Sequence, residues 1–375
     1  MIIKLSKITV KFFLILTIIF LFDVIINAIL PEKIKKKIGI TRNYSLRTPN
    51  FHHEIAPNIS VNEFWGSKKY NVTTNNYGMR ILKNNTMSLD IQKKNIGFIG
   101  DSFVYGSGID YEKHFINILN NKNNNLNLLN LGYVGYSPSI YYKKLKHLII
   151  EKKIKFKKIF IFIDTSDVQD EGIFYRENDK GQIVRKWLTD EENEQKLKKY
   201  KLKNYFQQNS FIFKLQQMFF LPTVNDKGKI CLENKENVND FLKYIDYDRF
   251  AYGFDENTQT KKWVNEGQNK VLKYLNKIKK LSNEQKFELI IVYYPSAIEV
   301  LKKIDFKKSL HYKLLKNWSD ITNTLFIDTS LNFDTLNTGL KNYKQYFIVC
   351  DVHWSKNGHK IIAKNLSMFL NEKNN

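Results

Sequence analysis

The sequence predicts an α/β protein, a three-layer sandwich with a central parallel sheet, preceded by an N-terminal transmembrane helix and carrying a mostly helical insertion. Two patterns lead to this prediction. Between residues 95 and 370, short apolar runs typical of buried strands alternate with amphipathic helical patterns. Such alternation favours a parallel sheet with helices on both faces. Near the N-terminus, residues 12–30 form a run of nineteen almost uniformly apolar residues.

The apolar run at 12–30 has the length of a membrane-spanning helix, which needs about 20 residues. Only Thr17, Asp23 and Asn27 interrupt it, and Pro31 follows. No small-x-small cleavage site follows the run, so we favour an uncleaved signal anchor over a cleaved signal peptide or a buried core helix. Lysines flank both ends, so the positive-inside rule gives no orientation.

These patterns divide the chain into successive parts. Prolines, asparagines and threonines after the anchor indicate an irregular juxtamembrane segment, and a charged helical run at 188–202 interrupts the strand–helix alternation. We expect an anchor at 1–31, a juxtamembrane segment at 32–94, an α/β domain at 95–370 with an insertion at about 171–265, and a tail at 371–375.

Within the α/β domain, each element follows from its own sequence pattern. Apolar runs bounded by polar residues and glycines predict the strands, and 3.6-residue periodicity predicts the helices. Pro138 opens one helix, and Ser355 is a typical N-cap for the last. The expected strands are 95–99, 128–131, 159–163, 289–293 and 325–327, and the expected helices are 111–120, 138–150, 271–281 and 355–370.

The chain is basic, with a formal net charge of +23 at pH 7. Its lysines are spread over the whole length alongside many asparagines and isoleucines, which indicates a compositional bias rather than a patch. No helix-turn-helix, zinc or RNA-binding signature is present, so we expect no nucleic-acid partner. Contact with anionic lipid or an acidic polysaccharide stays open. Cys231 and Cys350 form no Cys-x-x-Cys motif, and their spacing leaves a single disulfide open.

Residues that can carry chemistry follow the predicted strands. Ser102 comes just after the first strand, and Asp351 and His353 follow an extended run near the C-terminus. The carboxyl ends of parallel strands are where such sheets bind ligands. A nucleophilic serine needs a base and an acid that orients it. His353 is the best base among the seven histidines, because Asp351 lies two residues before it and can reach its Nδ1.

Other polar residues receive structural interpretations. Asp101 is expected to shape the turn before Ser102, and His359 on the closing helix is expected to be a surface or capping histidine. His52 and His53 have no partner cluster of metal-binding residues in the juxtamembrane segment, so we predict no metal site.

Three sequence blocks carry a family resemblance. Gly100-Asp101-Ser102, the stretch Asn-Leu-Gly-Tyr-Val-Gly-Tyr at 130–136, and the Asp351/His353 pair resemble blocks of the SGNH/GDSL hydrolase superfamily. The Asp-x-His-Trp spacing is similar to its DHHW and alginate O-acetyltransferase-like branch. The turn Asn-Tyr-Gly-Met-Arg at 76–80 resembles an element of membrane-anchored bacterial members. The resemblance implies a flavodoxin-like sheet, Ser102 as nucleophile, and the Gly135 backbone N–H as an oxyanion donor.

The third block departs from this pattern. Ser166 follows the third strand at the position where the superfamily carries an asparagine that donates to the oxyanion. A serine hydroxyl is shorter and rotates freely. Loss of one such donor costs about 10²–10³ in rate in other enzymes. Three interpretations stay open: an oxyanion hole retuned around Ser102, Gly135 and Ser166, a donor from elsewhere, or reduced activity.

The resemblance implies a serine-dependent ester hydrolase or O-acyl(acetyl)transferase that works through an acyl-enzyme without a cofactor. Its substrate would be an acylated cell-envelope glycan or a small ester. The chain would cross the bacterial inner membrane once and hold its domain outside the cytoplasm. Two alternatives remain. One is a catalytically weak glycan-binding or scaffold protein of the same fold, and the other is a basic protein that binds an anionic polymer through charge.

Overall fold

A five-stranded parallel sheet lies at the centre of the computed structural model, which describes residues 2–29, 45–65, 68–83, 94–123, 125–210, 212, 247–333 and 339–370. The strand order is β12–β11–β8–β6–β7, and every neighbouring pair is parallel. Counted within this sheet along the chain, the first strand (β6) lies between the second (β7) and the third (β8). This is the flavodoxin-like strand order. The predicted α/β fold class is confirmed. The strands are β6 (Lys94–Ile99), β7 (Leu126–Asn130), β8 (Lys158–Phe162), β11 (Glu288–Tyr293) and β12 (Leu325–Asp328).

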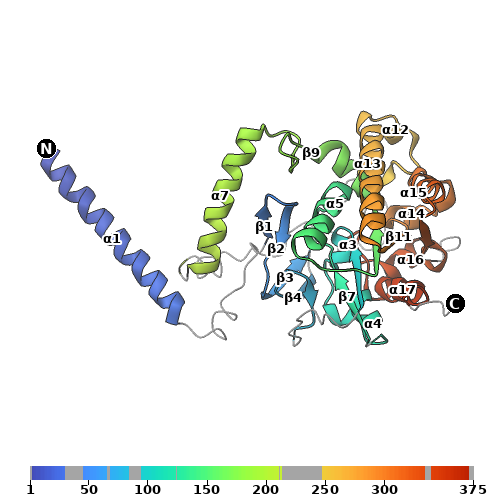
Figure 1. The fold of residues 1–375 in the computed structure, drawn as a ribbon, viewed down its shortest axis with the longest axis horizontal. Coiled ribbons are helices and arrows are strands. Elements are labelled where there is room, and N and C mark those ends of the chain that lie inside the picture. The colour runs from blue at the N-terminus through green and yellow to red at the C-terminus, as the bar shows by residue number, and fades with distance from the viewer. Residues whose placement is uncertain are drawn as a thin grey trace.

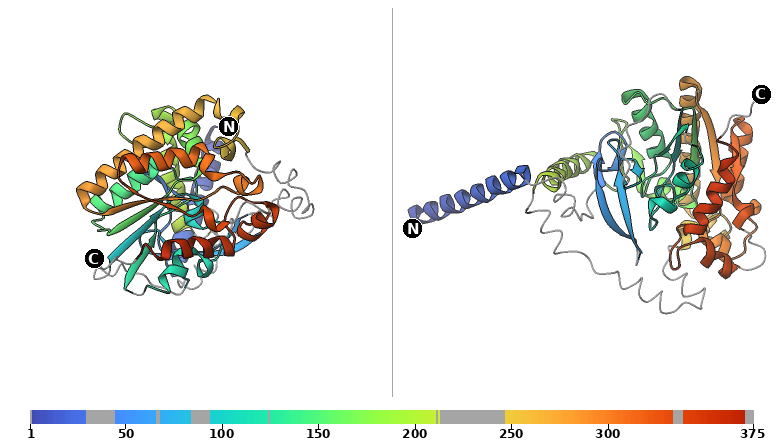
Figure 2. Two further views of the ribbon diagram at one scale, coloured as in Figure 1. Left: turned by 90° about the vertical axis from the view of Figure 1, so that its right-hand side faces the viewer. Right: turned by 90° about the horizontal axis from the view of Figure 1, so that it is seen from below.

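Helices cover both faces of this sheet (Figure 2). On one face α4 (Phe115–Asn120) packs against α17 (Lys356–Ser367), and on the other α5 (Pro138–Lys146) packs against α13 (Lys262–Gln285). Because both faces are covered, β8 is buried along its whole length. Aromatic rings fill part of the core, where Phe98 and Phe160 stack with centroids 5.0 Å apart.

Local sequence sets the helix ends. Pro138 lies in the first turn of α5, where its missing N–H leaves no bond unmade. The predicted Ser355 cap is confirmed, since its Oγ accepts the backbone N–H groups of Asn357 and Gly358. The remaining helical elements of the domain are α3 (Ser102–Tyr105), η1 (Tyr111–Lys113), η2 (His147–Glu151), α6 (Thr165–Gln169), η3 (Asp170–Phe174), α14 (Ala297–Leu301), η4 (Phe306–Lys308), α15 (Leu310–Ile321), η5 (Ser330–Phe333) and α16 (Gly339–Tyr346).

The described residues between 45 and 83 form strands joined by turns, so the prediction of irregular structure is wrong for this part of 32–94. Tyr70 and Val72 pack in the same core as the central sheet. The prolines, asparagines and threonines of this segment predicted irregular structure. Its strands are instead stabilised by cross-strand and tertiary contacts, which a local sequence pattern does not show. Residues 30–44 and 84–93 lie outside the described residues. The strands are β1 (Ser45–Thr48) paired with β2 (His52–Ile55), and β3 (Ser60–Trp65), β4 (Lys68–Thr74) and β5 (Arg80–Ile81) in a second antiparallel sheet.

Arg80 joins this N-terminal sheet to the segment that follows β6. Its guanidinium is buried and donates to the backbone carbonyls of Tyr105, Gly106 and Ile109 at 2.7–2.9 Å. Carbonyls at the end of a short helix lack intrahelical donors, so the arginine satisfies them. The turn at 76–80 therefore supports the backbone immediately after Ser102.

The insertion begins with a β-hairpin, β9 (Tyr175–Glu177) and β10 (Ile183–Arg185). The helix α7 (Asp190–Asn209) follows and confirms the helical interpretation of the charged run at 188–202. Residues 211 and 213–246 lie outside the described part. Two short helices, α11 (Tyr247–Ala251) and α12 (Glu256–Gln259), lead back to the domain.

The N-terminal helix α1 (Ile2–Ile29) extends away from the α/β body (Figure 1). Its window Thr9–Ile26 has a mean hydropathy of 2.5, and 6% of that window is buried. By length and composition this helix suits a membrane span or a signal sequence, and its exposure argues against a core helix. Asp23 is an exception on this surface, because it is buried and accepts the backbone N–H of Ile212 at 2.7 Å.

Candidate active site

Ser102 is the first residue of α3, directly after β6. Gly100 allows this abrupt turn, since a Cβ there would come within 2.5 Å of Val104. Asp101 caps α3 through its Oδ1, which confirms that it shapes the turn. Because β6 lies between β7 and β8, Ser102 is placed where the strand order reverses, the usual ligand position in open α/β sheets.

His353 contacts Ser102 across 251 residues of sequence. The distance from His353 Nε2 to Ser102 Oγ is 2.7 Å. On the other side of the ring, Nδ1 makes a short hydrogen bond to Asp351 Oδ1, which also accepts the His353 backbone N–H at 2.8 Å. A carboxylate can only accept, so Nδ1 carries the proton and Nε2 is free to accept from the serine hydroxyl.

Trp65 holds the second oxygen of Asp351. Its indole Nε1 donates to Asp351 Oδ2 at 2.8 Å, and its ring meets the His353 ring edge-on with centroids 4.9 Å apart. Both carboxylate oxygens are therefore occupied, which fixes the carboxylate plane relative to the imidazole. Trp65 was not predicted as a site residue, because its sequence pattern indicated a juxtamembrane segment.

Burial and charge act in opposite directions on this pair. Burial tends to lower the pKa of His353, but the charge of Asp351 and its hydrogen bond outweigh burial and raise that pKa above its ordinary value. Burial tends to raise the pKa of Asp351, and the charge and hydrogen bonds of His353 lower it overall. The arrangement therefore stabilises a protonated imidazole beside an ionised carboxylate.

Gly135 lies in the loop after β7 with a φ of +73°, a conformation that favours glycine. Two side chains bind the carbonyl oxygens of this loop. Tyr175 Oη donates to the Gly135 carbonyl at 2.6 Å, and His53 Nε2 lies 2.8 Å from the Val134 carbonyl oxygen. Within the described ranges, no group accepts a hydrogen bond from the backbone N–H of Ser102 or Gly135. Neither Tyr175 nor His53 was predicted to support this loop, because both reach it through tertiary packing.

Ser166 also borders the site. Its Oγ donates to Asp164 Oδ2 at 2.5 Å, within the capped start of α6. In this arrangement the hydroxyl proton is directed at a carboxylate rather than at an incoming oxyanion.

All five sequence-predicted site residues line one cavity of about 300 Å³. Arg249 of α11 lines it as well and pairs with Asp170 at 2.8 Å, while its Nε is buried without a partner in the described structure. Cys350, also at the rim, is disulfide-bonded; Cys231, the other cysteine of the sequence, lies outside the described residues. The candidate site residues brought together are Ser102, Gly135, Ser166, Asp351 and His353.

Acidic side chains gather beneath Ser102. Burial, with a contribution from Asp164, raises the pKa of Asp101 to about 7, and Asp101 Oδ2 lies 3.2 Å from Ser102 Oγ. Burial likewise raises the pKa of Asp170 to about 7, against the opposing charge of Arg249. Across the described residues, no group of three or more His, Cys, Asp or Glu is arranged to hold a metal ion.

Two expectations for other histidines are wrong. His359 is buried rather than at the surface, with its Nδ1 accepting the Phe115 N–H at 3.3 Å and its ring against Trp354. It is buried because α17 packs on α4. His52 and His53 belong to strand β2 and lie buried against the α/β domain, not in an irregular linker.

Comparison with known proteins gives structural likeness alone. No protein-family model and no curated sequence matches the chain. A member of the lipolytic protein G-D-S-L family from Veillonella parvula aligns with a TM-score of 0.37 at 14% identity, covering 73% of this chain and 96% of that one. An acetyl xylan esterase aligns with a TM-score of 0.39 at 13% identity, over 74% and 100% of the two chains. A catalytic mutant of an acetylxylan esterase from Geobacillus stearothermophilus aligns with a TM-score of 0.38 at 13% identity, over 76% and 98%.

Proposed function

We propose that this chain is a serine-dependent acyl-transfer enzyme of the SGNH type, with Ser102 as nucleophile, His353 as base and Asp351 as the acid that orients it. The observation that carries the proposal is the 2.7 Å contact between Ser102 Oγ and His353 Nε2, with Nδ1 held by Asp351. Nucleophilic attack on an ester requires a hydroxyl, a base that takes its proton, and an acid that orients the base.

The reaction follows from this geometry. Ser102 Oγ forms a bond to the ester carbonyl carbon while its proton moves to His353 Nε2. The tetrahedral intermediate then breaks its bond to the leaving alcohol oxygen, which takes the proton back from His353. A second hydroxyl, from water or a sugar, gives its proton to His353 Nε2 while its oxygen attacks the carbonyl carbon of the acyl-enzyme. The second tetrahedral intermediate then breaks its bond to Ser102 Oγ, which takes that proton from His353, and both residues are restored.

The backbone N–H groups of Ser102 and Gly135 are the proposed oxyanion donors. Neither has an acceptor within the described structure, and both residues border the cavity. Ser166 could join them only after its hydroxyl turns away from Asp164. The oxyanion hole is thus built mainly from backbone donors.

We place the domain outside the cytoplasm, tethered by α1. The apolar helix suits a membrane span, and a disulfide at Cys350 fits an oxidising compartment. An acyl ester on a cell-envelope glycan is the proposed substrate, with hydrolysis or transfer set by the acceptor.

The test is labelling with a fluorophosphonate, which reacts with activated serines. The full chain in neutral detergent should be labelled at Ser102, identified by peptide mass spectrometry, and should hydrolyse p-nitrophenyl acetate. Ser102→Ala should abolish both signals. Ser107→Ala is the matched control, since Ser107 is buried nearby but does not border the cavity. A folded chain that takes no label would contradict the proposal.

A catalytically weak glycan-binding protein is the second candidate, and the Ser166–Asp164 hydrogen bond favours it because it occupies the side-chain donor. This candidate predicts glycan binding that Ser102→Ala leaves unchanged, together with no fluorophosphonate labelling.

A further inference from the structure

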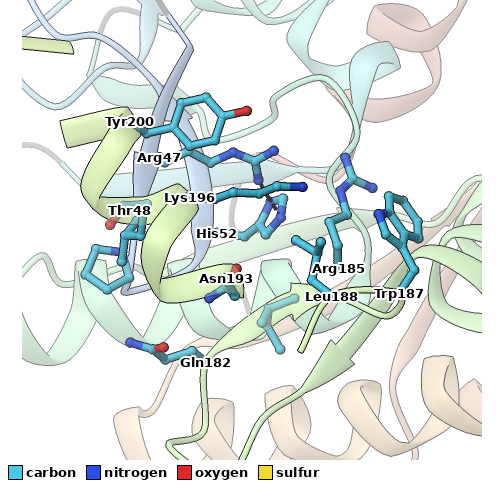
Figure 3. A pocket seen from close by; sticks show the side chains of 13 residues that line it. Arg47, Thr48, His52, Gln182, Arg185, Trp187, Leu188, Asn193, Lys196 and Tyr200 are labelled. Atoms are coloured by element: carbon cyan, nitrogen blue, oxygen red, sulfur yellow. Dashed lines mark hydrogen bonds between the residues drawn. The ribbon is translucent and has the colours of Figure 1, made fainter. Parts of the chain in front are cut away.

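A second cavity, of about 150 Å³, lies outside the catalytic cavity (Figure 3). Three separate elements enclose it: the β1–β2 hairpin, the β9–β10 hairpin and α7. Each contributes one cation, namely Arg47 from β1, Arg185 from β10 and Lys196 from α7. The sequence gives no hint of this gathering, because the three residues are far apart in the chain.

This cavity has positive charge without a balancing carboxylate. No Asp or Glu lines it. Two acids of α7 are paired with other cations, Asp190 with Arg176 and Glu194 with Lys180, and Glu192 accepts the Thr189 backbone N–H. Among the described residues, none forms an ion pair with Arg47, Arg185 or Lys196. Like charges held together this way repel one another, and a bound anion relieves that repulsion.

The three cations match a tetrahedral anion better than a planar one. A carboxylate presents its two oxygens in one plane and suits a single arginine fork, whereas a phosphate offers oxygens in several directions. Here two guanidinium groups and one ammonium approach from three different elements. A phosphate has enough acceptor oxygens for all three groups.

The remaining lining suits a sugar. Trp187 is 60% exposed, with the Arg185 guanidinium over its ring at 5.4 Å, and the Arg47 guanidinium lies over Tyr200 at 5.3 Å. The guanidinium groups cover one face of each ring, which leaves the other exposed surface of Trp187 for an apolar contact with a sugar ring. The Gln182 amide at the same cavity can hydrogen-bond to hydroxyls.

A chain of hydrogen bonds connects this cavity to the catalytic loop. Arg47 donates to the His52 ring, His52 Nδ1 lies 2.7 Å from His53 Nδ1, and His53 Nε2 lies 2.8 Å from the Val134 carbonyl oxygen. Val134 in turn lines the catalytic cavity. The side chains of Arg47, His52 and His53 therefore connect the second cavity to the loop that borders the catalytic cavity.

We propose that this second cavity binds a phosphate group carried by a saccharide, with Arg47, Arg185 and Lys196 as its ligands. The site would hold a phosphorylated part of the glycan on which the proposed function acts. This consequence rests on the proposed function, but binding at the site does not require Ser102 to react.

The test is calorimetric titration of the full chain, as Ser102→Ala in phosphatidylcholine nanodiscs, with glucose 1-phosphate, glucuronate, glucose and inorganic phosphate. Glucose 1-phosphate should bind at least tenfold more tightly than each of the other three. Arg185→Gln and Lys196→Gln should each weaken it by about tenfold or more, as expected for loss of a charged hydrogen-bond donor. Lys198→Gln is the matched control. Lys198 lies two positions after Lys196 on α7, so it faces the opposite side of the helix and does not line the cavity.

Glucuronate binding as tightly as glucose 1-phosphate would overturn the preference for phosphate. Inorganic phosphate binding equally well would overturn the saccharide assignment. Equal losses in Lys198→Gln and Lys196→Gln would show a diffuse charge effect rather than a site. Lys196 is exposed, so Lys196→Gln keeps the test valid if Arg185→Gln does not fold. Fluorophosphonate labelling of the chain with native Ser102 reports separately on the proposed function.

Discussion

Trp65 donates its indole N–H to Asp351 Oδ2 at 2.8 Å, across 286 residues of sequence. Asp351 Oδ1 faces His353, so the tryptophan and the histidine hold the two oxygens of one carboxylate. The N-terminal sheet is thus part of the candidate active site rather than a connection to the membrane helix. Loss of the Trp65 indole would release one oxygen of Asp351 and would also change the lining of the catalytic cavity, which Trp65 borders.

Trp65→Phe should lower kcat by about tenfold with a smaller change in KM, because Asp351 then loses one charge-assisted hydrogen bond and the imidazole is oriented less firmly. The measurement is steady-state hydrolysis of p-nitrophenyl acetate between pH 5 and 9. Trp318→Phe is the matched control, since it removes an indole hydrogen bond to Asn276 outside the cavity. Equal kcat losses in both variants would indicate a general loss of stability.

The rate should increase with pH through the titration of His353. Burial tends to lower the pKa of this group, but Asp351 raises it above the ordinary 6.5, and only the neutral ring can accept the serine proton. The midpoint of the pH–rate profile should therefore lie above 6.5. Asp351→Asn removes the charge, so the midpoint should move to lower pH and kcat should decrease by about 10³–10⁴-fold.

Asp328→Asn is the control for that profile, since Asp328 ends β12 and does not border the catalytic cavity. Its midpoint should equal that of the unmodified chain. A midpoint that stays in place in Asp351→Asn would assign the titration to another group.

Tyr175→Phe should lower kcat by about tenfold and leave KM nearly unchanged, because it frees the Gly135 carbonyl that Tyr175 Oη holds at 2.6 Å. A looser loop would misplace the Gly135 N–H, which the proposal uses only while negative charge develops on the oxyanion. Tyr274→Phe is the control, since its hydroxyl bonds to Glu177 away from the cavity. A rise in KM with kcat intact would argue that Tyr175 serves binding instead.

The sequence allowed prediction of those parts of the site that obey a spacing rule. Ser102 follows a strand of the parallel sheet, and the topology of such a sheet brings strand ends to one edge. The extended run predicted before Asp351 is not a strand of this sheet, since Phe347 forms only an isolated antiparallel bridge with Trp354. The two-residue spacing of Asp351 and His353 is what the sequence predicted correctly for this pair. Trp65 and Tyr175 reach the site through tertiary packing, which no local pattern records. His359 is a second case of this kind. It was predicted at the surface because it is a polar residue on a helix, but it is buried because α17 packs against α4.

Asp101→Asn should stabilise the chain at high pH. Burial, assisted by the charge of Asp164, raises the pKa of Asp101 to about 7 from 3.8. The folded state thus binds this proton more tightly than the unfolded state, and the associated stability is lost as pH rises from 3.8 through about 7. Asparagine stays neutral and is an equally good N-cap. The free energy of unfolding of the variant, relative to the unmodified chain, should therefore increase by roughly 2–4 kcal/mol between pH 4.5 and pH 8.

Urea titrations of the full chain in neutral detergent at the two pH values measure this difference. Asp305→Asn is the matched control, because Asp305 also caps a short helix but is exposed. Its relative stability should change little between the same two pH values. If Asp101→Asn behaves like Asp305→Asn, then the pKa of Asp101 is not raised by burial, and Asp101 is ionised beside Ser102 at both pH values.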